Sequence, residues 1–174
     1  MKLSEIREII LFREAIMAVK YQRKMAIVLF FLLIFFYAPA MSADISVEKK
    51  QIIKVVNQFF EVLASRDVNV AKQIVIPEGC SFSIREQNGV KVVKSSNFQG
   101  FLDNLPNPKA KYKEVMEDPK ILLHRGIAVL WAKYRFFIND KFSHCGVDAF
   151  SLMKTDKGWK IASIIYTVEK KGCN

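Results

Sequence analysis

The sequence of 174 residues lacks most of the short patterns that identify an enzyme class. Its seven glycines never form a GxGxxG or phosphate-loop pattern, so no loop for nucleotide phosphates is predicted. No serine stands in a nucleophile-elbow pattern. The chain has two histidines and three cysteines, and no cysteine pair has zinc-site spacing. We therefore expect neither a metal centre nor a cofactor.

The sequence also lacks repeats, low-complexity stretches and linkers rich in glycine, proline or serine. Its net charge is +10, but the lysines are scattered along the chain rather than clustered. Binding of nucleic acid requires clustered positive charge with groups that stack on or contact bases. The charge therefore predicts a solvated basic surface and no nucleic-acid partner.

Only one long hydrophobic run is present, the 14 apolar residues from Met25 to Ala38. Basic residues precede it, and Pro39 and small residues follow it, which is the order of a secretory signal peptide. We predict a signal peptide with an extended basic region over residues 1–43, cleaved after Ser42 or Ala43. The protein is then exported, and is periplasmic or secreted.

Two alternatives remain open at this end of the chain. The stretch from Met25 to Ala43 carries no charge, and an uncleaved signal of this kind would anchor the protein in a membrane. Pro39 and the small residues favour cleavage, so a membrane contact is expected only if the signal is retained. The true start of translation also remains open between Met1, Met17 and Met25.

Residues 44–174 have the length and composition of a single compact domain. Apolar residues at helical spacing from Ile52 to Leu63 predict a long amphipathic first helix. A second helix is predicted over Val68 to Ile76, where Pro77 and Gly79 end it.

The remaining pattern is mostly that of strands. Alternating apolar residues from Cys80 lead to Asn88-Gly89, the strongest short signal for a hairpin, and Val90 to Lys94 is the return strand. A short third helix is predicted over Ser96 to Leu105. Four long strands are predicted to follow, over Lys111 to Arg125, Gly126 to Ile138, Phe142 to Lys154 and Trp159 to Glu169.

Helices followed by a long meander indicate the α+β class. We expect three helices from the N-terminal half to pack on a strongly curved, mainly antiparallel sheet. Such a sheet forms a cone, and its mouth is a natural place for a pocket.

Three motifs carry a resemblance to a known family: Phe59 to Leu63 leading to Asp67, the strand entry from Pro77 to Phe82, and Gly158-Trp159-Lys160-Ile161. With the predicted order of elements, they make residues 44–174 similar to the nuclear transport factor 2-like superfamily of cone-shaped domains. His144 to Phe150 further resembles an exported bacterial branch of uncharacterised members.

The resemblance implies a fold rather than one activity, because this superfamily includes isomerases, dehydratases, polyketide cyclases, epoxide hydrolases and transport factors. Its enzymes place acid and base side chains inside the cone. We therefore look for such residues on the predicted strands.

His144, Gly146 and Asp148 share one face of a predicted strand, because alternate residues point the same way. The outer two lie ~13 Å apart along a strand and cannot form a hydrogen-bonded dyad, but they can hold opposite ends of a ligand. The alternative places His144 at the rim and pairs Asp148 with Arg125 or Arg135. A buried Asp148 without a basic partner would have a raised pKa and could act as a general base.

Trp131 and Tyr134 lie on opposite faces of the preceding strand, so at most one of them faces the cavity. Either is a candidate for an aromatic wall of a binding pocket, and either could equally be packed in the core.

Three cysteines in an exported domain allow one disulfide and one remaining thiol. We favour Cys145 with Cys173, because both lie on or just beyond the last two paired strands, with Cys80 as a small buried apolar residue.

The first functional hypothesis is an exported module that binds a small molecule, with His144 and Asp148 as polar anchors and Trp131 or Tyr134 as apolar wall. The second is an isomerase, dehydratase or cyclase in which Asp148 or His144 moves a proton. The third is a protein-interaction module that forms a homodimer through the outer sheet face.

Overall fold

The computed structural model describes residues 22, 45–107 and 110–173 of the chain. The chain divides into two compact units, Met1–Ser46 and Val47–Asn174, and the second contains almost all described residues. The predicted signal peptide over residues 1–43 lies outside the described residues except for Gln22. Of the helices in the part that is described, none combines the length and apolar character needed to cross a lipid bilayer.

The first described helix covers residues 45–65 and is amphipathic as predicted. Ile52, Val56 and Phe59 are buried on one side of it. Arg66 adopts a positive φ of 64° and ends the helix, and Asp67 caps the next one. The Asp67 carboxylate accepts hydrogen bonds from two backbone N–H groups of α2 (Val68–Ile74), which satisfies donors that a helix start leaves unpaired.

The second helix is shorter than the sequence predicted, because β1 (Val75–Gln87) begins before Pro77. Val75 is fully buried and pairs with Ile161 of the last strand, so burial overrides the helical pattern. The register then shifts between Val75 and Cys80. A strand tolerates proline at such an irregularity, where its missing N–H interrupts no regular ladder.

The hairpin at Asn88-Gly89 is confirmed, and both residues have a positive φ. Its return strand β2 (Val90–Asn97) extends beyond the predicted end at Lys94. Asn97 caps α3 (Phe98–Asn104) by accepting the backbone N–H of Gly100. The third helix is therefore confirmed, with a start two residues later than predicted.

The four predicted long strands are present as β3 (Tyr112–His124), β4 (Ile127–Ile138), β5 (Lys141–Thr155) and β6 (Gly158–Val168). The six strands form one sheet in the order β2-β1-β6-β5-β4-β3. Only the β1–β6 pair is parallel. The α+β class and the mainly antiparallel sheet are confirmed.

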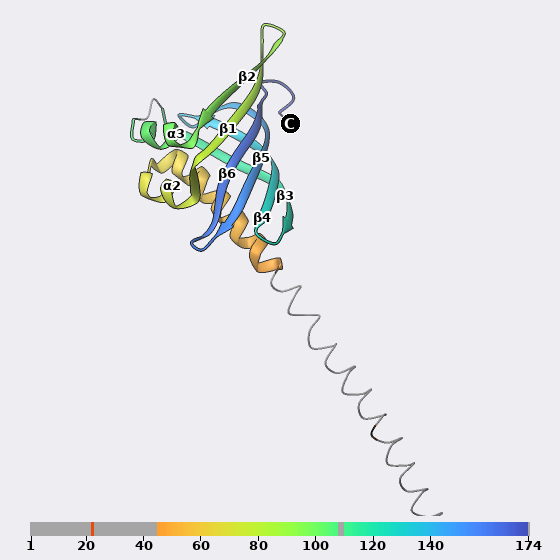
Figure 1. Ribbon diagram of the computed structural model, residues 1–174. Coiled ribbons are helices and arrows are strands. Elements are labelled where there is room, and N and C mark those ends of the chain that lie inside the picture. Colours follow the sequence, from red (N-terminus) through yellow and green to blue (C-terminus); the bar gives the residue numbers. More distant parts are fainter. Residues whose placement is uncertain (1–21, 23–44, 108–109, 174) are drawn as a thin grey trace, which may run out of the picture. The chain divides into compact units, whose positions relative to one another are not determined.

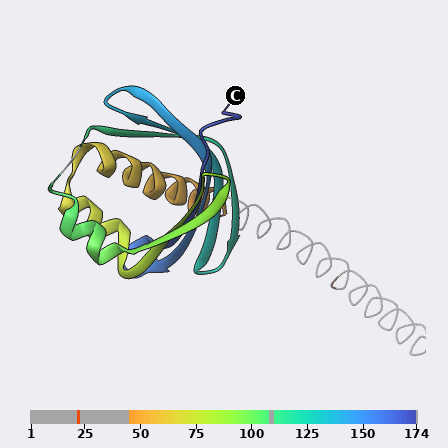
Figure 2. The ribbon, with the colours of Figure 1, turned by 90° about the horizontal axis from the view of Figure 1, so that it is seen from above.

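The helices pack on the concave face of the curved sheet, as Figure 1 shows from the side and Figure 2 from above. The core lies between the two layers. Its largest fully buried side chains are Phe150, Ile52, Leu130, Leu152, Ile161, Val56, Val62 and Val75.

One end of this core, beside the β5–β6 turn, is closed by a small polar network. Trp159, 4% exposed, donates its indole N–H to the carboxylate of Glu48 in the first helix. Lys154 forms an ion pair with the same carboxylate. These contacts fasten the helix to the β5–β6 hairpin, and they agree with a structural role for Trp159.

Candidate functional site

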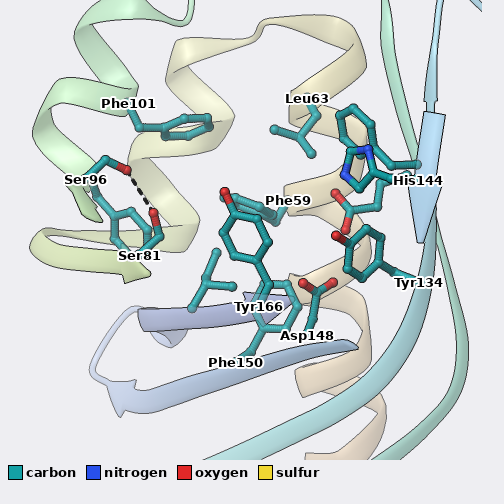
Figure 3. Close-up of a pocket in the computed structure, with 14 residues that line it drawn as sticks. Phe59, Leu63, Ser81, Ser96, Phe101, Tyr134, His144, Asp148, Phe150 and Tyr166 are labelled. Atoms are coloured by element: carbon teal, nitrogen blue, oxygen red, sulfur yellow. Dashed lines mark hydrogen bonds between the residues drawn. The ribbon is translucent and has the colours of Figure 1, made fainter. Parts of the chain in front are cut away.

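A cavity of about 240 Å³ lies between the helices and the concave face of the sheet (Figure 3). Most of its wall is apolar or aromatic, and five polar side chains interrupt it. The apolar and aromatic lining residues are Phe59, Leu63, Phe98, Phe101, Tyr134, Phe136, Phe150, Ile164 and Tyr166. The other lining residues are Ser81, Ser96, Glu114, His144 and Asp148.

Strand alternation explains which residues reach the cavity. His144, Asp148 and Phe150 are separated by even numbers along β5, so all point to the concave side. Tyr134 and Phe136 on β4 are the register partners of Gly146 and His144. Partners across a sheet share a face, and the two strands therefore present one continuous wall.

Two carboxyl groups meet at this wall. Asp148, 3% exposed, and the half-buried Glu114 of β3 are neighbouring cavity-lining acids, close enough for their side chains to share a hydrogen bond. Such a bond requires one of the two acids to be protonated, because two carboxylates offer only acceptors. Among the described residues, Asp148 Oδ2 has no hydrogen-bond partner. A proton shared with Glu114 would supply this buried oxygen with a partner.

Burial raises the pKa of both acids. Desolvation raises the pKa of Asp148 to about 7, although the hydrogen bond from Glu114 opposes the shift. Desolvation and the neighbouring charge of Asp148 raise the pKa of Glu114 well above its ordinary value. The pair as a whole therefore retains a proton to higher pH than two isolated acids would.

Tyr134 is 2% exposed and donates its phenol O–H to the carbonyl oxygen of Thr167 at 2.6 Å. Gly146 makes this approach of β6 to β5 possible, because a Cβ atom there would lie 2.3 Å from the same oxygen. Burial and the charges of Asp148 and Glu114 raise the pKa of Tyr134. Tyr134 is therefore a neutral hydrogen-bond donor in the cavity wall.

His144 lies against two aromatic rings. Its imidazole stacks on Phe136 with centroids 4.8 Å apart and meets Tyr134 edge-on at 5.8 Å. Its Nδ1 forms a 3.0 Å hydrogen bond with the hydroxyl of Ser143. Desolvation, then the positive charges of Arg85 and Lys170, lower the pKa of His144, so its ring is neutral at pH 7.

Comparison with solved structures identifies the architecture around this cavity. An NTF2-like superfamily protein from Salmonella enterica serovar Typhimurium matches with TM-score 0.57 and 17% identity, over 73% of this chain and 94% of that one. An NTF2-like protein with a cystatin-like fold from Novosphingobium aromaticivorans matches with TM-score 0.59 and 8% identity, over 77% and 90%. The chain has the nuclear transport factor 2-like fold.

A further protein with the nuclear transport factor 2-like fold, of unknown function and from Shewanella baltica, matches with TM-score 0.53 and 18% identity, over 72% of this chain and 97% of that one. No protein-family model matches the sequence, and no curated protein does so either. The likeness is therefore one of fold, which the sequence resemblance predicted.

Within this nuclear transport factor 2-like fold, the structure brings together three of the residues singled out from the sequence. His144, Asp148 and Tyr134 all line the cavity. Trp131 does not, because it lies on the opposite face of β4, where it is 37% exposed and Lys120 lies over its ring. Of the two aromatic candidates, Tyr134 is thus the one in the cavity wall.

The alternative partner for Asp148 is wrong. Arg135 points to the outer face and forms an ion pair with Glu117 at 2.6 Å, and Arg125 sits exposed in the β3–β4 turn. The actual neighbour, Glu114, was missed by the sequence reasoning. Its signal was available, because Tyr112, Glu114 and Met116 alternate along β3, which places an acid on the apolar face.

The structure contains the disulfide between Cys145 and Cys173. Cys80 is the free cysteine of the described residues. The bridge secures the segment after β6 to β5, beside His144, and Glu169 adds backbone hydrogen bonds to Cys145 in both directions. In the described ranges 22, 45–107 and 110–173, no three acidic, histidine or cysteine side chains gather as metal ligands.

Proposed function

We propose that this protein is an exported module that binds a small molecule in its interior cavity. The observation that carries the proposal is the composition of the cavity wall, which is largely aromatic around the buried Asp148 and its half-buried neighbour Glu114. Small-molecule sites commonly combine an apolar concave wall with a few oriented polar groups. Export is supported by the signal-like N-terminal sequence and by the Cys145–Cys173 disulfide, which suits an oxidising compartment.

The cavity limits what the ligand can be. Its volume of about 240 Å³ is below the range of ~300 to 1,000 Å³ typical of sites for drug-sized compounds, so a smaller ligand fits. Phe59, Phe101 and Phe150 favour a flat or apolar body. Asp148 lines the cavity, and its carboxyl group can form a hydrogen bond with a hydroxyl or N–H group of the ligand.

Native mass spectrometry of the protein as isolated from its own host tests this proposal. We expect an additional mass on the order of 100 to 250 daltons, that of a ligand smaller than drug-sized compounds, which disappears on denaturation. Ser96→Phe would place a ring on the cavity side of β2 and should abolish that mass. Its neighbour Ser95 points to the other face as the partner of Phe82, so Ser95→Phe should retain it.

A bare protein mass under these conditions argues against the binding function. A bare mass with a dimer peak would instead favour the homodimer hypothesis. The outer sheet face offers exposed apolar side chains for such a contact, among them Val129, Trp131 and Ile165.

Proton-transfer catalysis is the second candidate function, and the buried acid pair favours it. Burial holds Asp148 near the protonation midpoint at neutral pH, which suits a general base. Asp148→Asn should then abolish turnover of any substrate found through the bound mass, without lowering thermal stability. Parallel loss of turnover and stability would show that Asp148 is structural.

A further inference from the structure

A second hollow opens where β1 and the chain after β6 separate. The two strands pair in parallel up to Arg85 and Val168. The next residue, Glu169, instead forms backbone hydrogen bonds to Cys145 of β5, so the chain turns away from β1. The cleft left between them has a volume of about 670 Å³. Its charged lining residues are Arg85, Glu86, Lys91, Glu169, Lys170 and Lys171.

Positive charge is in excess in this cleft. Four cationic side chains face two acids, and none of the four takes part in an ion pair among the described residues. One of the acids, Glu169, already accepts a hydrogen bond from the Thr167 hydroxyl. The cleft therefore has the charge to hold an anion.

Arg85 provides the most specific observation. Its Nε atom is buried and, within the described part of the chain, has no hydrogen-bond partner. A buried donor on a charged group is costly to leave unpaired. A guanidinium carries further N–H groups on its two terminal nitrogens, and these match the two oxygens of a carboxylate bound in the cleft.

The cleft lies further along the same faces of β1 and β6 that line the cavity, although no described residue lines both hollows. Ser81 lines the cavity, and Arg85 lies four residues further along β1 on the same face of the strand. Val168, the partner of Arg85, lies two residues beyond the lining residue Tyr166 on β6. The charges of Arg85 and Lys170 act on His144, which lines the cavity itself. Arg85 and Lys170 thus lie toward the His144 side of the cavity.

We propose that Arg85, assisted by Lys170, binds the carboxylate of a ligand whose apolar body occupies the cavity. The ligand class is then a small aromatic or otherwise apolar carboxylic acid. This inference rests on the proposed binding function, and it adds the chemical class of the ligand. The carboxyl group of Asp148 in the cavity wall further favours an acid that carries a hydroxyl group at its far end.

Calorimetric titration of the protein as isolated from its host and freed of cargo tests this proposal. The probes are benzoate, phenylacetate, 4-hydroxybenzoate and 4-hydroxyphenylacetate, each compared with its primary amide, which has nearly the same shape and no charge. We expect at least one acid to bind about tenfold more tightly than its amide, the effect of a charge-assisted hydrogen bond.

Substitution of Arg85 distinguishes the contribution of its charge to ligand affinity from the contribution of the cavity. Arg85→Met should reduce acid affinity to that of the amide and leave amide affinity unchanged, which shows that the cavity remains folded. Arg85→Lys should retain part of the preference. Lys157→Met removes an equal charge from the exposed β5–β6 turn and should leave the preference intact.

Several outcomes would overturn the inference. Equal affinity of acids and amides, or a preference that survives Arg85→Met, would exclude the assigned role while leaving the binding function standing. Inorganic phosphate that binds as tightly as the acids, and depends on Arg85, would show an anion site unconnected to the cavity. Failure of all four acids would also refute the ligand class, and the mass of the native cargo would then decide the binding function by itself.

Discussion

Acidic side chains occur at two places between the helices and the sheet, and their pKa values shift in opposite directions. We call the network beside the β5–β6 turn the closed end and the cavity wall the open end. At the closed end, Glu48 is bound by Lys154 and Trp159, and these hydrogen bonds lower its pKa. At the open end, Asp148 meets another acid, Glu114, and burial raises the pKa of both. The same two strands, β5 and β6, contribute to both ends.

This difference in pKa distinguishes a structural role for Glu48 from a functional role for Asp148. The Glu48 arrangement stabilises the folded state, because its ionised form gains hydrogen bonds that the unfolded chain lacks. The Asp148 arrangement opposes folding above neutral pH, because a buried carboxylate must form beside a second acid. A pair of acids that destabilises the folded protein and has perturbed pKa values, placed in an apolar cavity, is typical of a functional site.

The acid pair predicts the largest effect. The folded protein binds more protons than the unfolded chain between the ordinary pKa of Asp148, 3.8, and its folded value of about 7. This contribution therefore lowers stability as pH rises through that window, by at most about 4 kcal/mol. Asp148→Asn should remove this part of the decline, with Glu114 still contributing, and raise the free energy of unfolding at about pH 8. Urea denaturation at several pH values measures it.

Other groups titrate in the same window, so the informative quantity is the difference between variant and parent. Asp156→Asn, in the exposed β5–β6 turn, is the matched control and should give a nearly flat difference. A variant that is less stable than the parent at alkaline pH would contradict the assigned burial penalty.

Removal of the disulfide is expected to have the next largest effect on the free energy of unfolding. The bridge lies at the open end and not at the closed end. Cys145 and Cys173 are separated by 28 residues, and closing a loop of this size contributes about 3.6 kcal/mol. Replacement of both by serine should lower stability by that amount and free the segment that carries Lys170. Cys80→Ser leaves the loop closed and serves as control. A count of three free thiols in the denatured, unreduced protein would refute the bridge.

Substitution of Glu48 at the closed end is expected to change the free energy of unfolding less, and with the opposite dependence on pH. Glu48→Gln should cost about 1 kcal/mol at neutral pH, because it removes the ion pair with Lys154 but keeps an acceptor for Trp159. The pKa of Glu48 is lowered, so this stabilisation is present above its ordinary value of 4.5 and is lost as pH falls through the folded pKa. Glu61→Gln, exposed on the same helix, is the control.

Most of the fold could be predicted from the sequence because its signals are local. Asn88-Gly89 requires positive φ at both positions, and the alternation of the long strands fixes their faces. The end of α2 could not be predicted, because it depends on Val75 pairing with Ile161, which is distant in the sequence. Tertiary burial decided that boundary over local propensity.

The site was predicted only in part for the same reason. His144 and Asp148 lie on one strand, and their shared face follows from their spacing alone. The pairing of Asp148 with Glu114 requires the register of β3 on β4 and of β4 on β5, which no local pattern gives. The cleft at Arg85 arises where two strands part, and it is likewise a property of the assembled sheet.

Substitution of Trp131 is expected to have the smallest effect on ligand binding, and it tests which face of β4 lines the cavity. Its neighbour Ala132 is 1% exposed and faces the core, so strand alternation places Trp131 outside. Trp131→Ala should lose the contact with Lys120 and the packing of the covered part of the ring on the outer sheet face, and should leave the cargo mass unchanged. Tyr134→Ala, on the inner face of the same strand, should remove the cargo. Loss of cargo in Trp131→Ala alone would move the binding site to the outer face and overturn the distinction between the two ends of the interior.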